Sequence, residues 1–231
     1  MSSQLQPVKL WGHTHINPPK VAMILEELDV PYELIPVTFE EVKQPDFLAI
    51  NPNGRLPAIH DPNTDMTLWE SGAILEYLIE KYDAEHRLSF APGTVESFQA
   101  KQWLFFQVSG QGPYYGQWGW FEMYHPEPVP SAKERYAKEI RRISGVLDTY
   151  LRQQKEKYGG NNGGPWLVGD KLSYADISFV MWQYLMMTRS QVLNEEEYPH
   201  LQEWMEKMTS RQKVKKVLEE AISALDAVAR S

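Results

Sequence analysis

Cysteine is the residue whose absence restricts this 231-residue chain most. Without cysteine, the protein has no disulfide, no thiolate nucleophile, no cysteine-ligated zinc site and no iron–sulfur cluster of its own. Any redox chemistry must therefore use a thiol or a cofactor that the protein borrows.

Positive charge and long apolar runs are also scarce. The chain has 23 Lys and Arg against 31 Asp and Glu, a formal net charge of −8, so no global field attracts phosphate backbones and we expect no nucleic acid partner. The most apolar stretch, 177–187, is too short to span a bilayer and contains Gln183. The first ten residues lack the apolar core of a signal peptide. The sequence therefore predicts a cytoplasmic protein that does not enter membranes.

The first part of the chain alternates strand-like runs with helical patterns. Between Val21 and Leu28, apolar residues recur at i, i+3, i+4 and i+7, the period of a helix with one buried face. Pro36 places the second strand at a sheet edge or at its own end. Strands are predicted at 8–11 and 32–37, after the turn at 53–54, and at 66–69, and helices at 18–28, at 46–50 and from 71.

The remainder is helical almost throughout. Helices are predicted at about 94–124, 131–158, 173–188, 198–208 and 211–229. Ser173 and Asp176 match a capping box, a structural device. The fold class is therefore an α/β N-terminal domain, residues 1–83 in the order β-α-β-α-β-β-α, a linker at 84–93, and an all-α C-terminal domain, residues 94–231.

Asn17-Pro18-Pro19-Lys20 is the first segment that can carry chemistry. Asn before Pro is typical of a helix N-cap with Pro in the first turn. One interpretation is therefore that Asn17 only caps this helix. The other interpretation follows from the position of this helix directly after the first strand. There its positive N-terminus would face a binding crevice, and an anionic ligand atom would meet backbone N–H groups and the Asn17 side chain.

Two further segments have the same double interpretation. In Arg55-Leu56-Pro57-Ala58, proline opens a strand, but a cis Leu56–Pro57 bond would turn the Leu56 main chain outward to pair with an extended peptide. In Glu70-Ser71-Gly72, Ser71 is suited to cap the next helix. Alternatively its hydroxyl and N–H bind a carboxylate, while Glu70 faces an ammonium group.

Together, on this α/β frame, the three segments resemble the cytosolic glutathione transferases, which have a thioredoxin-like N-terminal domain and an all-helical C-terminal domain. The likeness covers about residues 8–225 and is greatest to the group of the yeast prion-forming nitrogen regulator and the bacterial nu class. The matching segments are N-P-P-K-V-A-M-I-L-E-E-L, P-D-F-L-A-I-N-P-N-G-R-L-P-A-I, W-E-S-G-A-I-L-E-Y-L and Q-V-S-G-Q-G-P-Y-Y-G-Q.

The resemblance implies a site for glutathione, as substrate or co-substrate. The γ-glutamyl carboxylate and amine are expected at Ser71 and Glu70, and the cysteinyl main chain at Leu56. Lys43 or Gln44 would bind the glycyl carboxylate. The glutathione-binding residues that the likeness predicts are Asn17, Lys43, Arg55, Leu56, Glu70, Ser71 and Arg135.

The residue that activates the thiol is expected near the first strand. Ser and Tyr hydroxyls, which could donate a hydrogen bond to the thiolate, are scarce there. No Ser lies between Ser3 and Ser71, and Tyr32 is the only Tyr before Tyr77. In the resembled group an Asn takes this role, so Asn17 is the first catalytic candidate and Thr14 the second. His15 can also be an ordinary turn residue, and no metal is expected, because His13 and His15 have no carboxylate or Cys partners nearby.

A cluster of aromatic residues follows at 103–124. No Lys or Arg occurs from 102 to 132, which argues against a nucleic acid stacking platform. Trp103, Phe105 and Phe106 are expected in the core between helices. The Gly-rich run 109–119 is not expected to pack as a regular helix, so its Tyr114, Tyr115 and Trp118 are predicted to line a pocket for the second substrate.

These inferences favour an enzyme that activates the glutathione thiolate. Glutathione-dependent disulfide reduction and peroxidase activity are favoured over conjugation of electrophiles, so the partner is a small-molecule disulfide or electrophile, consistent with detoxification. The alternatives are a non-catalytic glutathione-binding regulatory module that interacts with a protein partner, and a glutathione-dependent isomerase or dehalogenase. The family likeness also implies a homodimer.

Overall fold

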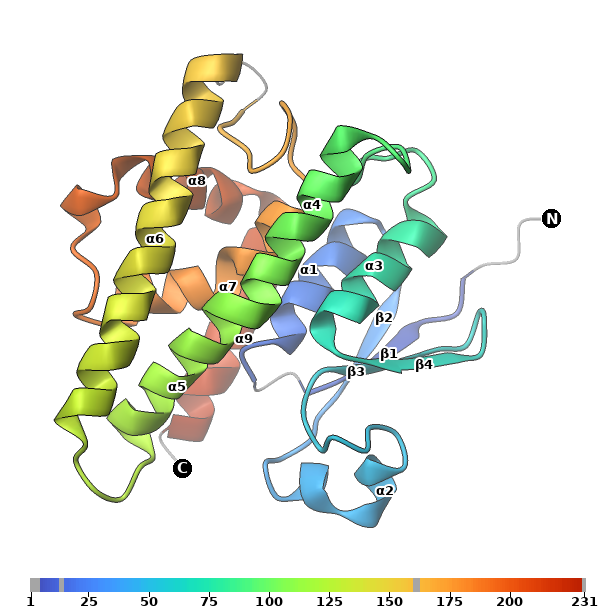
Figure 1. Cartoon of the computed structure of the whole chain (residues 1–231). Helices are drawn as coiled ribbons and strands as arrows, with labels where there is room; N and C mark the ends of the chain where they lie inside the picture. Colours follow the sequence, from blue (N-terminus) through green and yellow to red (C-terminus); the bar gives the residue numbers. More distant parts are fainter. Residues whose placement is uncertain (1–4, 13–14, 160–162, 230–231) are drawn as a thin grey trace. The chain divides into compact units, whose positions relative to one another are not determined.

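The computed structural model describes residues 5–12, 15–159 and 163–229. The chain divides into two compact units, and each is described by itself (Figure 1). The N-terminal unit comprises residues 1–87 together with 209–231, and the helical unit comprises residues 88–208.

The N-terminal unit is built on a four-stranded mixed sheet in the order β2-β1-β3-β4. β1 is parallel to β2 and antiparallel to β3, and β3 is antiparallel to β4. Its elements are β1 (Val8–Trp11), α1 (Pro18–Glu27), β2 (Tyr32–Ile35), α2 (Pro45–Leu48), β3 (Ala58–Asp61), β4 (Met66–Trp69) and α3 (Ser71–Tyr82). The predicted order β-α-β-α-β-β-α is confirmed. β2 is an edge strand, as predicted, and ends one residue before Pro36, which has no N–H to donate to the ladder.

α1 and α3 pack on each other and on the sheet through apolar side chains. Leu10 on β1 and Ile59 on β3 are paired across the sheet and fully buried. The predicted buried face of α1 is confirmed, because every apolar residue of its 3.6-residue period is buried. Those residues are Val21, Ile24, Leu25 and Leu28.

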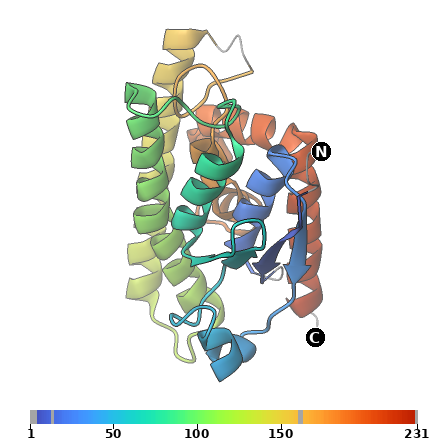
Figure 2. The ribbon, with the colours of Figure 1, turned by 90° about the vertical axis from the view of Figure 1, so that its right-hand side faces the viewer.

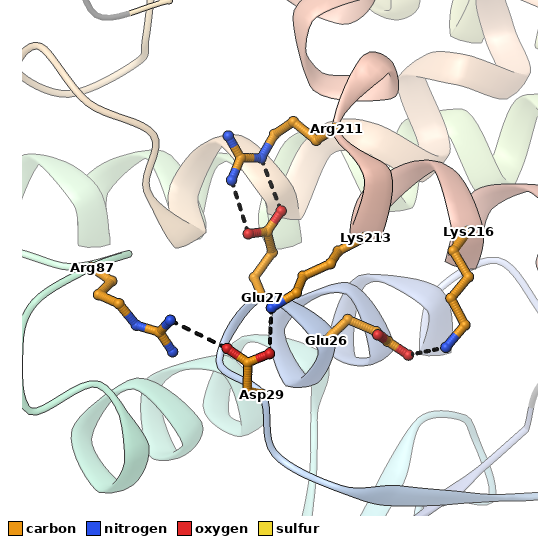
Figure 3. Close-up of polar contacts among 7 residues, drawn as sticks. All are labelled: Glu26, Glu27, Asp29, Arg87, Arg211, Lys213 and Lys216. Carbon is orange, nitrogen blue, oxygen red and sulfur yellow. Dashed lines mark hydrogen bonds and ion pairs between the residues drawn. The ribbon is translucent and has the colours of Figure 1, made fainter.

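The last helix, α9 (Gln212–Ala229), belongs to the N-terminal unit by its contacts, although the sequence prediction assigned it to the helical domain. It runs beside α1 (Figure 2). Three acid–base pairs join the C-terminal end of α1, with Asp29 just after it, to α9, with Arg211 just before it (Figure 3). They are Glu26–Lys216, Glu27–Arg211 and Asp29–Lys213, with N–O distances of 2.6, 2.9 and 2.5 Å.

The helical unit contains α4 (Val95–Phe106), a π-helical turn (Gln107–Gln111), α5 (Gly112–Met123), α6 (Pro130–Tyr158), α7 (Tyr174–Arg189) and α8 (Pro199–Ser210), whose last two residues pass into the N-terminal unit. α6 packs along α5 (Figure 1). α7 is buried on nearly all sides and begins with the predicted capping box, in which the Ser173 N–H donates to Asp176 Oδ2 at 3.0 Å. Asp176 Oδ1 also accepts hydrogen bonds from the Leu167 N–H and the Trp204 indole N–H.

Candidate functional site

One row of paired residues brings four loops to the same edge of the sheet. Across the strands, Ile35 pairs with Trp11, Trp11 with Ala58, and Ala58 with Trp69. β1, β2 and β4 end at this row, whereas β3 begins there. Residues 12 and 15–17 and the segments 36–44, 53–57 and 70–71 therefore adjoin the sheet at this row, and they contain most of the predicted site residues.

Contacts between these loops confirm that they meet. Gly12 has a φ of +99°, and a Cβ built on it would lie 2.6 Å from Leu56 Cδ1, so the Leu56 side chain packs directly on the Gly12 backbone. His15 Nε2 lies 3.3 Å from the Val37 carbonyl oxygen. The His15 ring meets the Phe39 ring edge-on, with centroids 4.3 Å apart. His15 is therefore engaged with the loop after β2.

The turn before Leu56 is organised by a buried asparagine. Asn51 Nδ2 donates to the Arg55 carbonyl oxygen at 2.6 Å, and Asn51 Oδ1 accepts from the Asn53 N–H at 2.9 Å. The Lys43 ammonium donates to the Gly54 carbonyl oxygen at 2.6 Å. Lys43, a sequence candidate for binding the glycyl carboxylate, thus lies beside this turn, and one of its donors is used by the protein main chain.

The turn presents the main chain of Leu56. The Leu56–Pro57 peptide is cis, the isomer for which the sequence argument expected an outward-facing Leu56 main chain. Among the described residues, no backbone hydrogen bond uses the N–H or the C=O of Leu56. Arg55, immediately before it, is exposed. Both groups of the Leu56 peptide can therefore pair with an extended ligand.

Asn17 occupies the N-cap of α1, and Pro18 and Pro19 are its first two residues, as predicted. Its side chain makes no capping hydrogen bond. Proline at the second helical position has no N–H, and the N–H of Lys20 at the third is directed to the Asn17 carbonyl oxygen at 3.3 Å. The capping interpretation is therefore wrong for the side chain. The expectation of several free N–H groups at this terminus is also wrong, because the two prolines remove two of them.

The first turn of α3 differs from the sequence expectation by one residue. Glu70, with φ +69°, is the N-cap, and the first intrahelical bond runs from the Ile74 N–H to the Glu70 carbonyl oxygen at 3.0 Å. Ser71 is therefore the first helical residue and not the cap. The left-handed backbone at a non-glycine residue is a strained conformation, of the kind that is concentrated at functional sites.

With Glu70 as the N-cap, the Ser71 hydroxyl and the first N–H groups of α3 are hydrogen-bond donors that a ligand can use. Ser71 is only 8% exposed, and its hydroxyl has no hydrogen-bond partner in the part of the chain that the structure describes. The N–H groups of Ser71, Gly72 and Ala73 precede the first helical bond and have no acceptor within the helix. A buried hydroxyl without a partner costs free energy, so this turn fits a carboxylate ligand at the positive end of α3.

Lys20 was not assigned a role from the sequence. It lies in the first turn of α1 and is only 1% exposed. Burial lowers the pKa of its ammonium group to about 7, although the nearby Glu70 carboxylate acts in the opposite direction. The available signal was its spacing, because Lys20 lies four residues before Ile24 on the apolar stripe of α1.

In the helical unit, the prediction that Tyr115 lines a pocket is wrong. Tyr115 is fully buried, and its hydroxyl lies 3.1 Å from Gln183 Oε1 and 3.2 Å from Ser144 Oγ. Gln111 and Gln107 extend this network of buried polar groups. Tyr115 is therefore a core residue that connects α5, α6 and α7.

The glycines of this segment explain the difference. Gly110 lies in the π-helical turn, so the predicted irregularity is found only at the start of the run. From Gly112 to Met123 the glycines do not interrupt the regular helix α5. A Cβ on Gly112 or Gly116 would lie within 4 Å of the Trp182 ring, so these positions allow α7 to approach closely. Tyr115 is on the same helical face, three residues after Gly112, and is buried with it.

The other aromatic predictions have mixed outcomes. Trp103 is buried as expected, whereas Phe105 is 66% exposed, so its core prediction is wrong. Tyr114 and Trp118 are half-buried and remain candidates for a pocket wall. Arg135 is an exposed residue of α6. Thr14 lies outside the described residues.

Within the described residues, no helix is long and apolar enough to cross a membrane. In the same part of the chain, no group of three or more His, Cys, Asp or Glu side chains is placed to hold a metal ion.

The fold and this site define a class of protein. Residues 6–80 match the family model "Glutathione S-transferase, N-terminal domain", and residues 119–221 match "Glutathione S-transferase, C-terminal domain". The chain belongs to the glutathione S-transferase family.

Within the family its relatives are of the Ure2 type and similar fungal proteins. The glutathione S-transferase-like protein gedE of Aspergillus terreus is 57% identical over 222 residues, which cover 94% of this chain and 96% of gedE. The glutathione transferase URE2P8 of Phanerochaete chrysosporium, solved with oxidized glutathione, is 38% identical with a TM-score of 0.87, covering 98% and 99% of the chains. Ure2p5 of the same fungus, cocrystallized with 1-(S-glutathionyl)-2,4-dinitrobenzene, is 37% identical with a TM-score of 0.83, each chain being covered to 99%.

Proposed function

We propose that this protein binds glutathione at the sheet edge and uses its thiolate to reduce disulfides and peroxides in preference to conjugating electrophiles. The observation that carries the binding proposal is the buried Ser71 hydroxyl, which has no partner among the described residues and lies at the start of α3 beside Glu70. A free amino acid head group, with one carboxylate and one ammonium, matches this pair. The γ-glutamyl end of glutathione is such a group.

The order of the loops along the sheet edge indicates where the cysteinyl and glycyl parts of glutathione would bind. The cysteinyl main chain would pair with the unused N–H and C=O of Leu56, with Arg55 beside it. The glycyl carboxylate would then lie toward Lys43, whose ammonium is already placed next to Gly54. Arg135, from the helical unit, remains a proposed glutathione contact on the family likeness alone.

The thiol would lie at the N-terminus of α1. At an ordinary pKa of about 8.5, only a few per cent of a thiol is ionised at neutral pH, and a pKa about two units lower requires about 3 kcal/mol of preference for the thiolate. The Asn17 side chain, which makes no capping bond, is the first candidate donor, supported by the dipole of α1. Thr14 is the second.

Disulfide reduction is consistent with the lack of cysteine. One glutathione thiolate attacks the substrate disulfide, forming a mixed disulfide and expelling a substrate thiolate, which takes up a proton. A second glutathione thiolate attacks the glutathione sulfur of the mixed disulfide, releasing the second substrate thiol and oxidised glutathione. Both sulfurs come from glutathione, so the protein supplies binding and orientation. The structural relative URE2P8 was solved with oxidized glutathione, the product of this exchange.

The deciding experiment is glutathione-dependent reduction of 2-hydroxyethyl disulfide by the purified protein, with conjugation of 1-chloro-2,4-dinitrobenzene measured in parallel. We expect disulfide turnover well above the uncatalysed exchange and weaker conjugation. Conjugation alone would overturn the preference for disulfides and favour the chemistry of the conjugate found in Ure2p5. Glutathione binding without either turnover would favour a regulatory binding module.

We also propose a homodimer. α4 has an exposed row of large apolar side chains, Val95, Phe98 and Phe105, spaced along one side of the helix and each about two-thirds exposed. A second copy of the chain would cover such a row. Light scattering of the wild-type protein should give twice the chain mass, and Phe98→Asp should shift it toward the single-chain mass.

A further inference from the structure

A lysine is an unfavourable residue at position 20. The position is buried, so the charge of an ammonium is separated from water. It also lies in the first turn of α1, where the helix dipole disfavours a cation. Neither helix propensity nor packing explains a Lys at this position, because an apolar residue would extend the buried apolar stripe that includes Ile24. A residue that costs stability in this way is expected to serve a function.

The carboxylate that acts on Lys20 comes from the junction of β4 and α3, and α3 packs directly against α1. That carboxylate belongs to Glu70 and favours the charged form of Lys20, while burial disfavours it. Glu70 is itself exposed, so it can meet both Lys20 on the protein side and a ligand on the solvent side.

Among the described residues, the cations beside the other end of α1 pair with acids there. Those cations are Arg211, just before α9, and Lys213 and Lys216 of α9, and the acids lie in and after the last turn of α1. The buried residues of α3 are Ser71 and the apolar Ile74, Leu75 and Leu78. Glu76 of α3 is half-buried, and Lys9 of β1 is exposed. Glu70 is the N-cap of α3 and acts on Lys20, so a ligand at the start of α3 can act on Lys20 through this carboxylate.

We propose that the buried ammonium of Lys20 and the ammonium of a bound γ-glutamyl ligand compete for the Glu70 carboxylate, so that ligand binding expels a proton from Lys20. The inference rests on the proposed binding of a γ-glutamyl group at Glu70 and Ser71. Lys20 is a positioning residue in this account, because it acts on the ligand through Glu70.

The proton balance is simple. Before binding, the negative charge of Glu70 offsets the positive charge of Lys20. The ligand brings a second cation to the same carboxylate, and one N–H bond of the Lys20 ammonium then breaks. Its electron pair stays on the nitrogen and the proton passes to the buffer, so the site keeps one positive charge opposite Glu70 in both states.

The pH dependence follows from the free protein, in which the pKa of Lys20 is about 7. At about pH 6 most Lys20 side chains are charged, so binding should release close to one proton, and at pH 7 about half a proton. Toward pH 8 Lys20 is already neutral and release should approach zero. Affinity should therefore rise by up to about tenfold from pH 6 to pH 8.

Isothermal titration calorimetry of the full-length protein tests this. The ligand is S-methylglutathione, which has no ionisable thiol, titrated at pH 6 and pH 7.5 in pairs of buffers with different ionisation enthalpies. Lys20→Met keeps the length of the side chain without the charge and should abolish proton release, whereas the exposed Lys9→Met is the matched control and should leave it unchanged. As a test on the unmodified protein, glutaryl-S-methylcysteinylglycine, which lacks the amine, should release no proton from Lys20.

The outcomes separate the two proposals. Absence of S-methylglutathione binding to the wild-type protein would contradict the proposed function itself. Binding whose heat does not depend on the buffer at pH 6, or equal proton release by wild type and a folded Lys20→Met, would overturn the role of Lys20 and leave the glutathione site intact. Release of a proton by the ligand without an amine would also overturn it.

Discussion

The two ends of α1 carry charges of the sign that the helix dipole disfavours, but they are compensated differently. At the C-terminal end, Glu26 and Glu27 lie at the negative pole of the helix. They pair with Lys216 of α9 and with Arg211 just before α9, at 2.6 and 2.9 Å (Figure 3). At the N-terminal end, the buried Lys20 lies at the positive pole and is compensated by Glu70. The acids at the C-terminal end are thus paired within the protein. The carboxylate that compensates Lys20 at the N-terminal end belongs also to the proposed ligand site.

From this difference we expect the C-terminal end of α1 to contribute to stability and the N-terminal end to contribute to function. The acids at the C-terminal end have strong, fixed partners, and the Arg211 fork binds both oxygens of Glu27. Disturbing them should change folding and leave chemistry alone. At the N-terminal end, the Asn17 side chain does not cap the helix and Lys20 costs stability. Changes there should affect chemistry and leave folding unchanged or improved.

The largest effect is expected from Asn17→Ala. Loss of a hydrogen-bond donor to the thiolate should lower disulfide turnover about 100-fold. The free energy of unfolding should fall by less than about 1 kcal/mol, because no capping bond is lost. Thr94→Ala is the matched control. Thr94 caps α4 by accepting a bond from the Ser97 N–H at 3.2 Å, so this variant should lose about 1 kcal/mol of stability and keep its turnover. Unchanged turnover of Asn17→Ala would move the role to Thr14.

Lys20→Met should stabilise the protein by about 1–3 kcal/mol at pH 6, measured by urea unfolding. The pKa of Lys20 is lowered to about 7 by burial, so above pH 7 the unfolded chain binds a proton that the native state does not. Wild-type stability should then rise relative to the variant by about 1 kcal/mol per pH unit up to the ordinary lysine pKa. A variant less stable than wild type at pH 6 would give Lys20 a structural role.

Arg211→Ala should destabilise the N-terminal unit by about 1–2 kcal/mol, because it leaves the buried Glu27 carboxylate without its bidentate partner. Turnover per folded molecule should not change. The double variant Glu27→Gln with Arg211→Ala should recover part of the loss, since the uncompensated charge is removed. A fall in turnover without a loss of stability would contradict the separation of the two ends.

The smallest effect is expected from Lys216→Ala. Its ammonium is about half exposed in the pair with Glu26, and exposed pairs contribute less than about 1 kcal/mol. Urea unfolding should show a loss of a few tenths of a kcal/mol that disappears at high salt. A loss as large as that of Arg211→Ala would mean that the α1–α9 pairs act as one network.

The sequence predicted the order of elements in the N-terminal unit, because hydrophobic period and turn residues such as Pro36 report on local structure. The site residues came from the family likeness, and the structure brings the loops of Asn17, Leu56 and Ser71 to one edge. Two features could not be predicted locally. The burial of Tyr115 depends on the approach of Trp182 from α7, 67 positions along the chain. The grouping of α9 with α1 depends on ion pairs between residues about 184–190 positions apart.

The central claim is that the start of α3 binds the γ-glutamyl group of glutathione. Its most direct test is the affinity of Ser71→Ala for S-methylglutathione, compared with Ser131→Ala in the first turn of α6, an exposed serine outside the site. Loss of a hydrogen bond to a charged carboxylate should weaken binding by Ser71→Ala about 10- to 100-fold, and Ser131→Ala should bind as wild type does. Equal affinity of the two variants, both folded, would contradict the assignment of the site.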